Sequence, residues 1–520
     1  MRKSQNKNIL FFSLLSSFII LFYQFNNIWV GIYENAQVSG CDSFGYARQA
    51  QLFRKSNNFF SALDTSINKD VQFVLNNWGA NTSIKYKDWY QMVAPHAHYF
   101  RPDTQEVILQ YPPGTGLLLS FFQENKARKI LWILSFTSIS CLFLARLNIS
   151  DNPLTNIFIA LSCLGSLYIT NTFSTRSDSI APSCLIAVLI SSLAVRSINF
   201  LNKSKKIPLL EILLITFIFG FSLLIRPGNI LFFMAPLSIY IIAFKLKIKY
   251  TFRAILISFP VFFSSILPLL KANQINAGSF FSSTYSSIDT TFDISSFLVN
   301  LSLKNESVED SIRVIIVLVF SLIFSYLALN QKEKSGFYYS RRILIFSSWI
   351  FMILMIFLMT LKPVFNLYYI APQLVMTASI SSMSILITQS SIMSNFFTID
   401  RLRRALMASS ICIFIFGYVF IKPTIIESFP FVNKLSSSSI IWSDSIGSKL
   451  LYYYDLNVAK LNFGSNDAQK EIVEYLSNNN IEQFVLDEGN IISKFKDISS
   501  GSLEEFAIFN NRKIYKYIPE

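Results

Sequence analysis

Two aspartates stand beside long apolar segments, where a membrane protein rarely places charge. Asp42 opens the stretch "GCDSFGYARQAQLF" (40–53), and Asp178 lies in "TRSDS" (175–179) between two apolar runs. An ionised carboxylate buried at a membrane boundary is costly, so such groups usually have a partner or a chemical role. A positioned carboxylate can take a proton from a hydroxyl group as a general base. We therefore predict that Asp42 and Asp178 are catalytic residues.

Each aspartate also has a purely structural interpretation. Asp42 would cap the helix that follows it, because Tyr46, Ala47, Ala50 and Phe53 recur at helical spacing. Asp178 would pair with the nearby arginine of "TRSDS" or cap the next apolar segment. Both interpretations stay open at the level of sequence.

Cations and aromatic residues gather at the ends of other apolar segments. Arg176, Arg226 and Lys362 are suited to hold an anionic head group such as phosphate. Alternatively, Arg226 and Lys362, each directly before a proline, anchor to lipid head groups. A general base together with cations that hold a phosphate suits a group-transfer reaction in which a lipid phosphate is the leaving group. The remaining predicted substrate-binding residues are Tyr46, Arg48, Tyr111, Pro112, Pro113, Tyr368 and Tyr369.

Both histidines of the chain, His96 and His98, lie in "APHAHYF". Alternate residues of an extended loop are able to ligate one metal ion, which makes a divalent metal a possible cofactor. The competing interpretation is that the two are neutral surface residues. Pro112 and Pro113, in "LQYPPGTG", restrict the backbone and are expected to shape the chain there.

Composition sets the class of protein. Of 520 residues, 52% are hydrophobic and 15% are charged, whereas about a quarter of a soluble globular chain is charged. We therefore predict a polytopic, all-α membrane protein. The formal charge of +14 comes from short basic clusters between apolar segments, which is typical of cytoplasmic loops and does not indicate a nucleic-acid partner.

Eleven apolar segments are long enough to be spans. A short cytoplasmic N-terminus (1–8) precedes a retained signal anchor, and the membrane domain covers 9–421. An outer loop (33–129) contains the short apolar segment of a re-entrant element (112–122). Counting that element as a span would move the later basic clusters outside, against the positive-inside rule. The predicted spans are 9–32, 130–147, 153–172, 179–196, 207–225, 228–244, 252–270, 312–330, 343–361, 368–390 and 405–421.

The C-terminal segment changes character. Over 436–520, "SSIIWSD" and "IEQFVLDE" are typical of strands, "DAQKEIVEYLSN" of a capped amphipathic helix, and "EFAIFNNRKIYKYI" of one or two strands. We predict a small extracytoplasmic α/β domain, and no phosphate loop or nucleophile elbow occurs in its sequence.

Taken in order, these motifs resemble the GT-C superfamily of glycosyltransferases. The similarity covers 9–421 and rests on five features: the Asp-x-x-x-Tyr that opens the outer loop, the Pro-Pro element, the Arg-x-Asp at 176–178, the Arg-Pro at 226–227, and the segments "NQINAGSFFSSTY" (273–285) and "NLYYIAPQ". It is greatest to the bacterial branch of protein O-mannosyltransferases and aminoarabinose transferases.

The resemblance implies an inverting transfer of a sugar from a polyprenyl-phosphate carrier to an acceptor on the outer face of the inner membrane. Asp42 matches the first-loop aspartate, implied to be the base or an acceptor-binding group, and Asp178 matches a second acidic position. Many relatives carry Asp-Glu where this chain has Asp42-Ser43, which weakens a metal role. The acceptor would be a lipid, a glycan or a protein.

Two other functions fit a polytopic chain. A polymerase or ligase of lipid-linked polysaccharide is also outward-facing, but such proteins generally carry their large outer loop late in the chain. A lipid-linked sugar transporter or flippase often shows internal repeats or charges at the membrane midplane. The sequence shows neither, because its ionisable residues cluster at the ends of the apolar segments.

Overall fold

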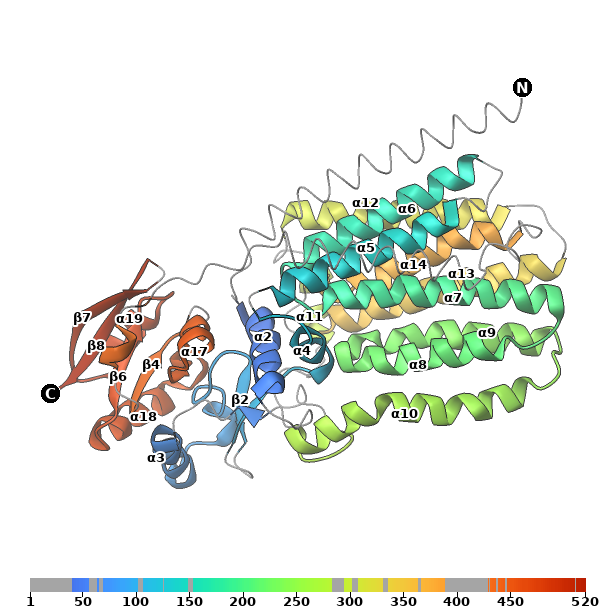
Figure 1. The fold of residues 1–520 in the computed structure, drawn as a ribbon. Coiled ribbons are helices and arrows are strands. Elements are labelled where there is room, and N and C mark those ends of the chain that lie inside the picture. The colour runs from blue at the N-terminus through green and yellow to red at the C-terminus, as the bar shows by residue number, and fades with distance from the viewer. Residues whose placement is uncertain are drawn as a thin grey trace. The chain divides into compact units, whose positions relative to one another are not determined.

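The chain forms two compact units in the computed structural model (Figure 1). The helical unit takes in 1–34, 125–270 and 286–422, and the mixed unit takes in 35–124, 271–285 and 423–520. The structure describes residues 40–55, 63–64, 69–101, 106–124, 126–147, 153–282, 294–301, 307–330, 335–362, 366–388, 429, 431–435, 438–444, 447–509 and 511–520.

The helical unit consists of helices throughout its described part. The α-helices are α5 (Ala127–Leu147), α6 (Pro153–Ser174), α7 (Ile180–Ser204), α8 (Leu209–Ile225), α9 (Met234–Lys245), α10 (Thr251–Ala277), α11 (Ile294–Leu301), α12 (Val308–Asn330), α13 (Ser335–Thr360) and α14 (Ala371–Met383). Of α10, residues 251–270 belong to this unit. Short 3₁₀ helices, η2 (Pro227–Phe233), η3 (Leu367–Tyr369) and η4 (Ser384–Thr388), lie beside α9 and α14.

Six described helices are long and apolar enough to cross a membrane. They cover Ile157–Ser174, Ile180–Ser204, Pro227–Lys245, Thr251–Ala277, Val308–Asn330 and Phe337–Thr360, and the apolar helix α8 is shorter. The protein is therefore a helical, multi-pass membrane protein.

The predicted spans agree with these helices in position but not in number. The described helices support fewer spans than eleven, and predicted spans 9–32 and 405–421 lie outside the described residues. Helix α13 begins at Ser335 instead of 343, because its basic first turns are satisfied within the helical unit. Arg341 donates to the carbonyl oxygen of Ala328, and Arg342 lies 4.0 Å from the ring centre of Tyr338.

Helices α10 and α14 show opposite burial. On α10, Phe252, Leu256, Phe259, Phe263 and Leu267 form an exposed apolar stripe at helical spacing, as expected of a helix that faces lipid. Every residue of α14 is buried. Serine hydroxyls fix it to its neighbours: one from α6 donates to the carbonyl oxygen of Ala378 over 3.1 Å, and one from α12 lies 2.8 Å from the hydroxyl of Ser381.

The mixed unit contains two sheets. The smaller, antiparallel sheet has the order β1 (Leu63–Asp64), β3 (Glu106–Leu109), β2 (His98–Arg101). The larger has the order β5 (Val458–Ala459), β4 (Ser439–Trp442), β6 (Glu482–Leu486), β8 (Arg512–Pro519), β7 (Gly501–Phe509), with β5, β4 and β6 parallel. Its α-helices are α2 (Gly40–Lys55), α3 (Lys69–Asn81), α4 (Pro113–Ser120), α17 (Ser448–Tyr454), α18 (Asn466–Asn478) and α19 (Ile491–Ile498).

The strands and the helix predicted for the tail are confirmed. "SSIIWSD" contains β4, "IEQFVLDE" contains β6, and the last stretch forms the hairpin β7–β8. Helix α18 is capped as predicted, because the side chain of Ser465 accepts the N–H of Ala468. The short elements α17, β5 and α19 were not predicted, and neither was the sheet of the outer loop.

Helix α2 confirms the predicted amphipathic helix. Tyr46, Ala47, Ala50 and Phe53 are all buried, as their spacing indicates. The short helix α4 packs closely on α2, since a Cβ atom at Gly116 would lie 2.3 Å from Oε1 of Gln49. Helix α4 occupies the segment predicted to be re-entrant, and it belongs to the mixed unit. Its re-entrance stays a prediction.

Candidate functional site

The first group of predicted residues lies in the mixed unit, around Asp42. Asp42 is the third residue of α2, inside the first turn instead of at the cap position before it. The hydroxyl of Tyr111 donates to its Oδ1 over 2.6 Å, and the Tyr111 ring lies 4.7 Å from that of Tyr46. A carboxylate in the first turn also gains from the positive end of the helix dipole. Asp42, which is half-buried, is thus an oriented carboxylate able to accept a proton.

Close packing fixes Tyr111 against α2. A Cβ atom at Gly45 would lie 2.3 Å from the Tyr111 ring, so the ring requires glycine at this position. The side chain of Gln49 donates to the carbonyl oxygen of Tyr111 over 3.1 Å. The next residue, Pro112, precedes α4, and Pro113 occupies its first turn, where proline is well tolerated. The two prolines therefore shape the chain as expected.

Arg48 faces inward from α2. It is 3% exposed, and its Nη1 donates to Gln51 over 2.8 Å and to Asp455 over 3.0 Å. The structure thus gives Arg48 protein partners, while its predicted contact with substrate stays a prediction.

His96 and His98 lie beside each other in the mixed unit. His98 is 1% exposed in β2, so the surface interpretation is wrong for this residue, and its Nδ1 lies 2.9 Å from the carbonyl oxygen of His96. In the part of the chain that the structure describes, no three His, Cys, Asp or Glu side chains gather as metal ligands. A divalent cofactor therefore gains no support from the geometry and stays a prediction.

The environment of His96 predicts a pH-dependent stability. Burial, followed by the charge of Lys460, lowers the pKa of His96 from 6.5 to about 4, while Glu488 opposes the shift. Between pH 6.5 and about 4, folded His96 stays neutral, whereas the unfolded chain takes up a proton. We expect the free energy of unfolding to fall by up to about 3 kcal/mol as the pH drops from about 6.5 to about 4.

Thermal unfolding of the wild type and of His96→Gln across this pH window measures the effect. The glutamine variant should lose much less stability on acidification than the wild type. Equal losses in the two proteins would contradict the assignment.

The second group of predicted residues lies in the helical unit, around Arg226. Helix α8 ends before Arg226, whose extended backbone leads into η2 at Pro227. The guanidinium carbon lies 5.2 Å from the ring centre of Tyr368 and 5.3 Å from that of Tyr369, and Nη1 donates to the hydroxyl of Ser179 over 3.2 Å. The nitrogen Nζ of Lys362 lies 4.9 Å from the Tyr369 ring centre. The structure therefore brings these four predicted residues together.

Arg226 is 7% exposed, which is inconsistent with a lipid-surface anchor. Among the residues that the structure describes, it contacts tyrosine rings and a serine hydroxyl but no carboxylate. A buried cation is costly unless an anion compensates its charge. The arrangement can therefore accept an anionic group, and the two ring faces offset only part of the cost.

Asp178 has a different partner from the one that the sequence indicates. Nε of Arg128 donates to both of its oxygens, over 3.0 and 2.9 Å, and Asp178 is fully buried. The N-cap residue of α7 is Ser179, so Asp178 does not cap that helix. Because Ser179 also binds Arg226, the Arg128–Asp178 pair fixes the turn that contacts the cationic group.

This buried pair predicts a large loss of stability when only one charge is removed. Asp178→Asn removes the negative charge that faces the buried guanidinium of Arg128, and we expect the free energy of unfolding to fall by about 3 kcal/mol. The double variant Arg128→Met/Asp178→Leu should recover most of this loss. Unfolding midpoints of both variants in one detergent provide the comparison, and a double variant less stable than the single one would contradict it.

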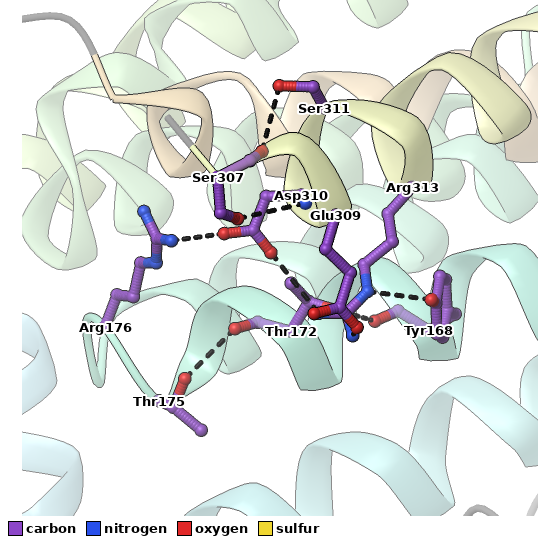
Figure 2. Close-up of polar contacts among 9 residues, drawn as sticks. All are labelled: Tyr168, Thr172, Thr175, Arg176, Ser307, Glu309, Asp310, Ser311 and Arg313. Carbon is purple, nitrogen blue, oxygen red and sulfur yellow. Dashed lines mark hydrogen bonds and ion pairs between the residues drawn. The ribbon is translucent and has the colours of Figure 1, made fainter. Parts of the chain in front are cut away.

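Arg176, in the turn after α6, belongs to an ion-pair network with residues of α6 and α12, as Figure 2 shows. It pairs with Asp310, and Asp310 also accepts from Arg313 over 3.3 Å. Arg313 pairs with Glu309 and donates to the hydroxyl of Tyr168 over 2.7 Å. The predicted pair of Arg176 with Asp178 is replaced by these contacts, so Arg176 ties two helices together.

Several residues of these two groups were not predicted from the sequence. Arg128, Asp310 and Ser179 lie at helix ends, but no motif singles them out. Gln373, one turn beyond Tyr369 on α14, is 2% exposed, and neither polar atom of its side chain has a hydrogen-bond partner among the described residues. Its amide is suited to bind a ligand, and the only signal in sequence is a glutamine within an apolar segment.

Comparisons of the chain with protein-family models, with curated proteins and with solved structures find no match.

Proposed function

We propose that the protein is an integral-membrane glycosyltransferase that moves a sugar from a polyprenyl-phosphate carrier to an acceptor. The observation that carries this proposal is Arg226, a buried cation that contacts two tyrosine rings and a serine hydroxyl but, within the described residues, no carboxylate. A carrier phosphate would supply the missing negative charge through bidentate hydrogen bonds. Lys362, on the Tyr369 ring, would add a second positive charge.

Asp42 would act as the general base of the transfer. It would take the proton of the acceptor hydroxyl while the acceptor oxygen bonds to the anomeric carbon of the sugar. The bond from that carbon to the phosphate oxygen would break, and the carrier would leave as polyprenyl phosphate. The hydrogen bond from Tyr111 supports this role, because it holds one oxygen of the carboxylate in a fixed direction.

The proposal includes a topology. With eleven spans and a cytoplasmic N-terminus, most basic clusters fall in inside loops, as the positive-inside rule requires. Asp42, Arg226 and the C-terminal domain would then be extracytoplasmic, at the inner membrane of a bacterium. This location suits a donor whose isoprenoid tail stays in lipid while its phosphate and sugar reach water.

The test is sugar transfer by membranes that carry the protein, from a panel of radiolabelled polyprenyl-phosphate sugars, with nucleotide sugars as controls. Transfer from one lipid-linked donor and from no nucleotide sugar is the expected result. Elongation by many repeat units would instead indicate a polymerase. Movement of the donor across vesicles without a new glycosidic bond would indicate a transporter.

A further inference from the structure

Two polar residues on one face of α2 hold the helix to the C-terminal segment of the chain. Arg48 and Gln51, both buried, lie one turn apart on the helix that carries Asp42. Nη1 of Arg48 donates to Oδ1 of Asp455 over 3.0 Å, and Nε2 of Gln51 donates to the carbonyl oxygen of Tyr452 over 3.1 Å. Both acceptors lie at the C-terminal end of α17. All of these contacts lie within the mixed unit.

The end of α17 is suited to receive a cation. Its last carbonyl groups carry the negative end of the helix dipole, and a positive side chain there is favourable. Asp455 ends the helix in the left-handed region, at φ 53°, and its N–H donates to the carbonyl oxygen of Leu451. This conformation turns the chain after α17. The Asp455 carboxylate accepts a hydrogen bond from Arg48, and its Oδ2 lies 3.7 Å from Nζ of Lys55.

A second set of contacts covers the edge of the larger sheet. In α/β sheets, ligands usually bind beyond the carboxyl ends of the parallel strands. Here Lys460, directly after β5, donates its N–H to the carbonyl oxygen of Met92 over 2.9 Å and its Nζ to that of His98 over 3.4 Å. Ser465 donates its N–H to the carbonyl oxygen of Asp88 over 2.9 Å. Residues 88–98 of the outer loop therefore occupy this part of the edge.

The neighbouring strand ends are also satisfied within the tail. The carboxylate of Glu488, after β6, accepts from the hydroxyl of Ser443 over 2.8 Å and from the N–H of Asp444 over 2.9 Å. Both donors follow β4. The groups that would contact a ligand in a typical α/β domain are thus bound to the protein itself, which favours a supporting role for the domain over a binding role.

We propose that the C-terminal segment, 423–520, positions α2 and therefore Asp42, and that Asp455 is the positioning residue. The contact itself does not depend on the reaction, whereas its effect on turnover rests on the proposed function. Removing the Asp455 charge should loosen α2 locally, because Arg48 is left buried with one hydrogen-bond partner fewer. Under the proposed function, the turnover number should then fall while the KM for the donor changes little.

The test is amide hydrogen exchange of the full chain in the wild type and in Asp455→Asn. Asparagine removes the charge and tolerates the left-handed backbone, so it avoids added strain. We expect the amides of α2 to exchange about five- to tenfold faster, with α18 and β6 unchanged. Glu505→Gln is the matched control, because it removes the charge of an exposed ion pair with Lys513 in the β7–β8 hairpin.

The outcomes separate the two proposals. Faster exchange confined to α2 in Asp455→Asn supports the positioning role. The double variant Arg48→Gln/Asp455→Asn should then exchange its α2 amides no faster than the more affected of the two single variants. Unchanged exchange of α2 in Asp455→Asn overturns it, and so does uniformly faster exchange throughout the mixed unit. If Asp455→Asn does not fold, Gln51→Met tests the adjacent contact in the same way. Absence of sugar transfer in the wild type would reject the proposed function and leave the exchange result standing.

Discussion

Asp42→Asn is expected to lower the turnover number of sugar transfer by about a thousandfold, with the protein folded and inserted in the membrane. The amide keeps the shape of the carboxylate and can still accept the hydrogen bond from Tyr111, but it cannot take up a proton. General-base catalysis typically contributes a factor of about 10²–10⁴. The measurement is initial rates at saturating donor and acceptor in reconstituted vesicles, for matched amounts of wild type and variant.

Asp467→Asn is the control for this substitution. Asp467 is an exposed aspartate in the first turn of α18. Like Asp42, it is therefore an aspartate in the first turn of a helix of the mixed unit. This variant should transfer sugar at the wild-type rate. If Asp42→Asn also retained the wild-type rate, Asp42 would have no part in the chemistry.

Arg226→Gln is expected to raise the KM for the lipid-linked donor by about a hundredfold. Hydrogen bonds from a guanidinium to phosphate are each worth about 1.5–3 kcal/mol, and about 1.4 kcal/mol corresponds to a tenfold change. Arg226→Lys keeps the charge but loses the planar fork, so a smaller rise is expected. Donor titrations in vesicles give the KM, and binding of polyprenyl phosphate compared with polyprenol isolates the phosphate contribution.

Arg196→Gln provides the comparison for the loss of an arginine. Arg196 lies on α7 and pairs with Glu211 at 3.2 Å, away from the tyrosines that contact Arg226. Its replacement should leave the donor KM unchanged. If Arg226→Gln also left the donor KM unchanged, the proposal that Arg226 binds the donor phosphate would be contradicted.

Local periodicity in the sequence predicts much of the fold. The spacing of Tyr46, Ala47, Ala50 and Phe53 predicts α2, and short apolar runs predict β4 and β6 in the tail, whose residues are almost all buried. The sheet of the outer loop was not predicted, and its strands are short: β1 has two residues, and β2 and β3 have four each. Such short strands depend on their tertiary partners, which periodicity does not reveal.

The predicted residue groups show where such inference succeeds. The predicted topology places Arg226, Tyr368 and Tyr369 at the same ends of their spans, and in the structure the guanidinium lies against both rings. The ion pair that closeness in sequence suggests was predicted less well. Arg176 and Asp178 are two residues apart in the turn between α6 and α7. Each instead pairs with a residue from a distant helix.

The most direct test of the proposed transfer is the amount of free polyprenyl phosphate formed for each sugar transferred, in vesicles that contain wild type or Asp42→Asn. We predict one polyprenyl phosphate for each new glycosidic bond in the wild type, and almost none of either product in the variant. Movement of the lipid-linked sugar across the bilayer, equal in both proteins and with no polyprenyl phosphate formed, would contradict a glycosyltransferase.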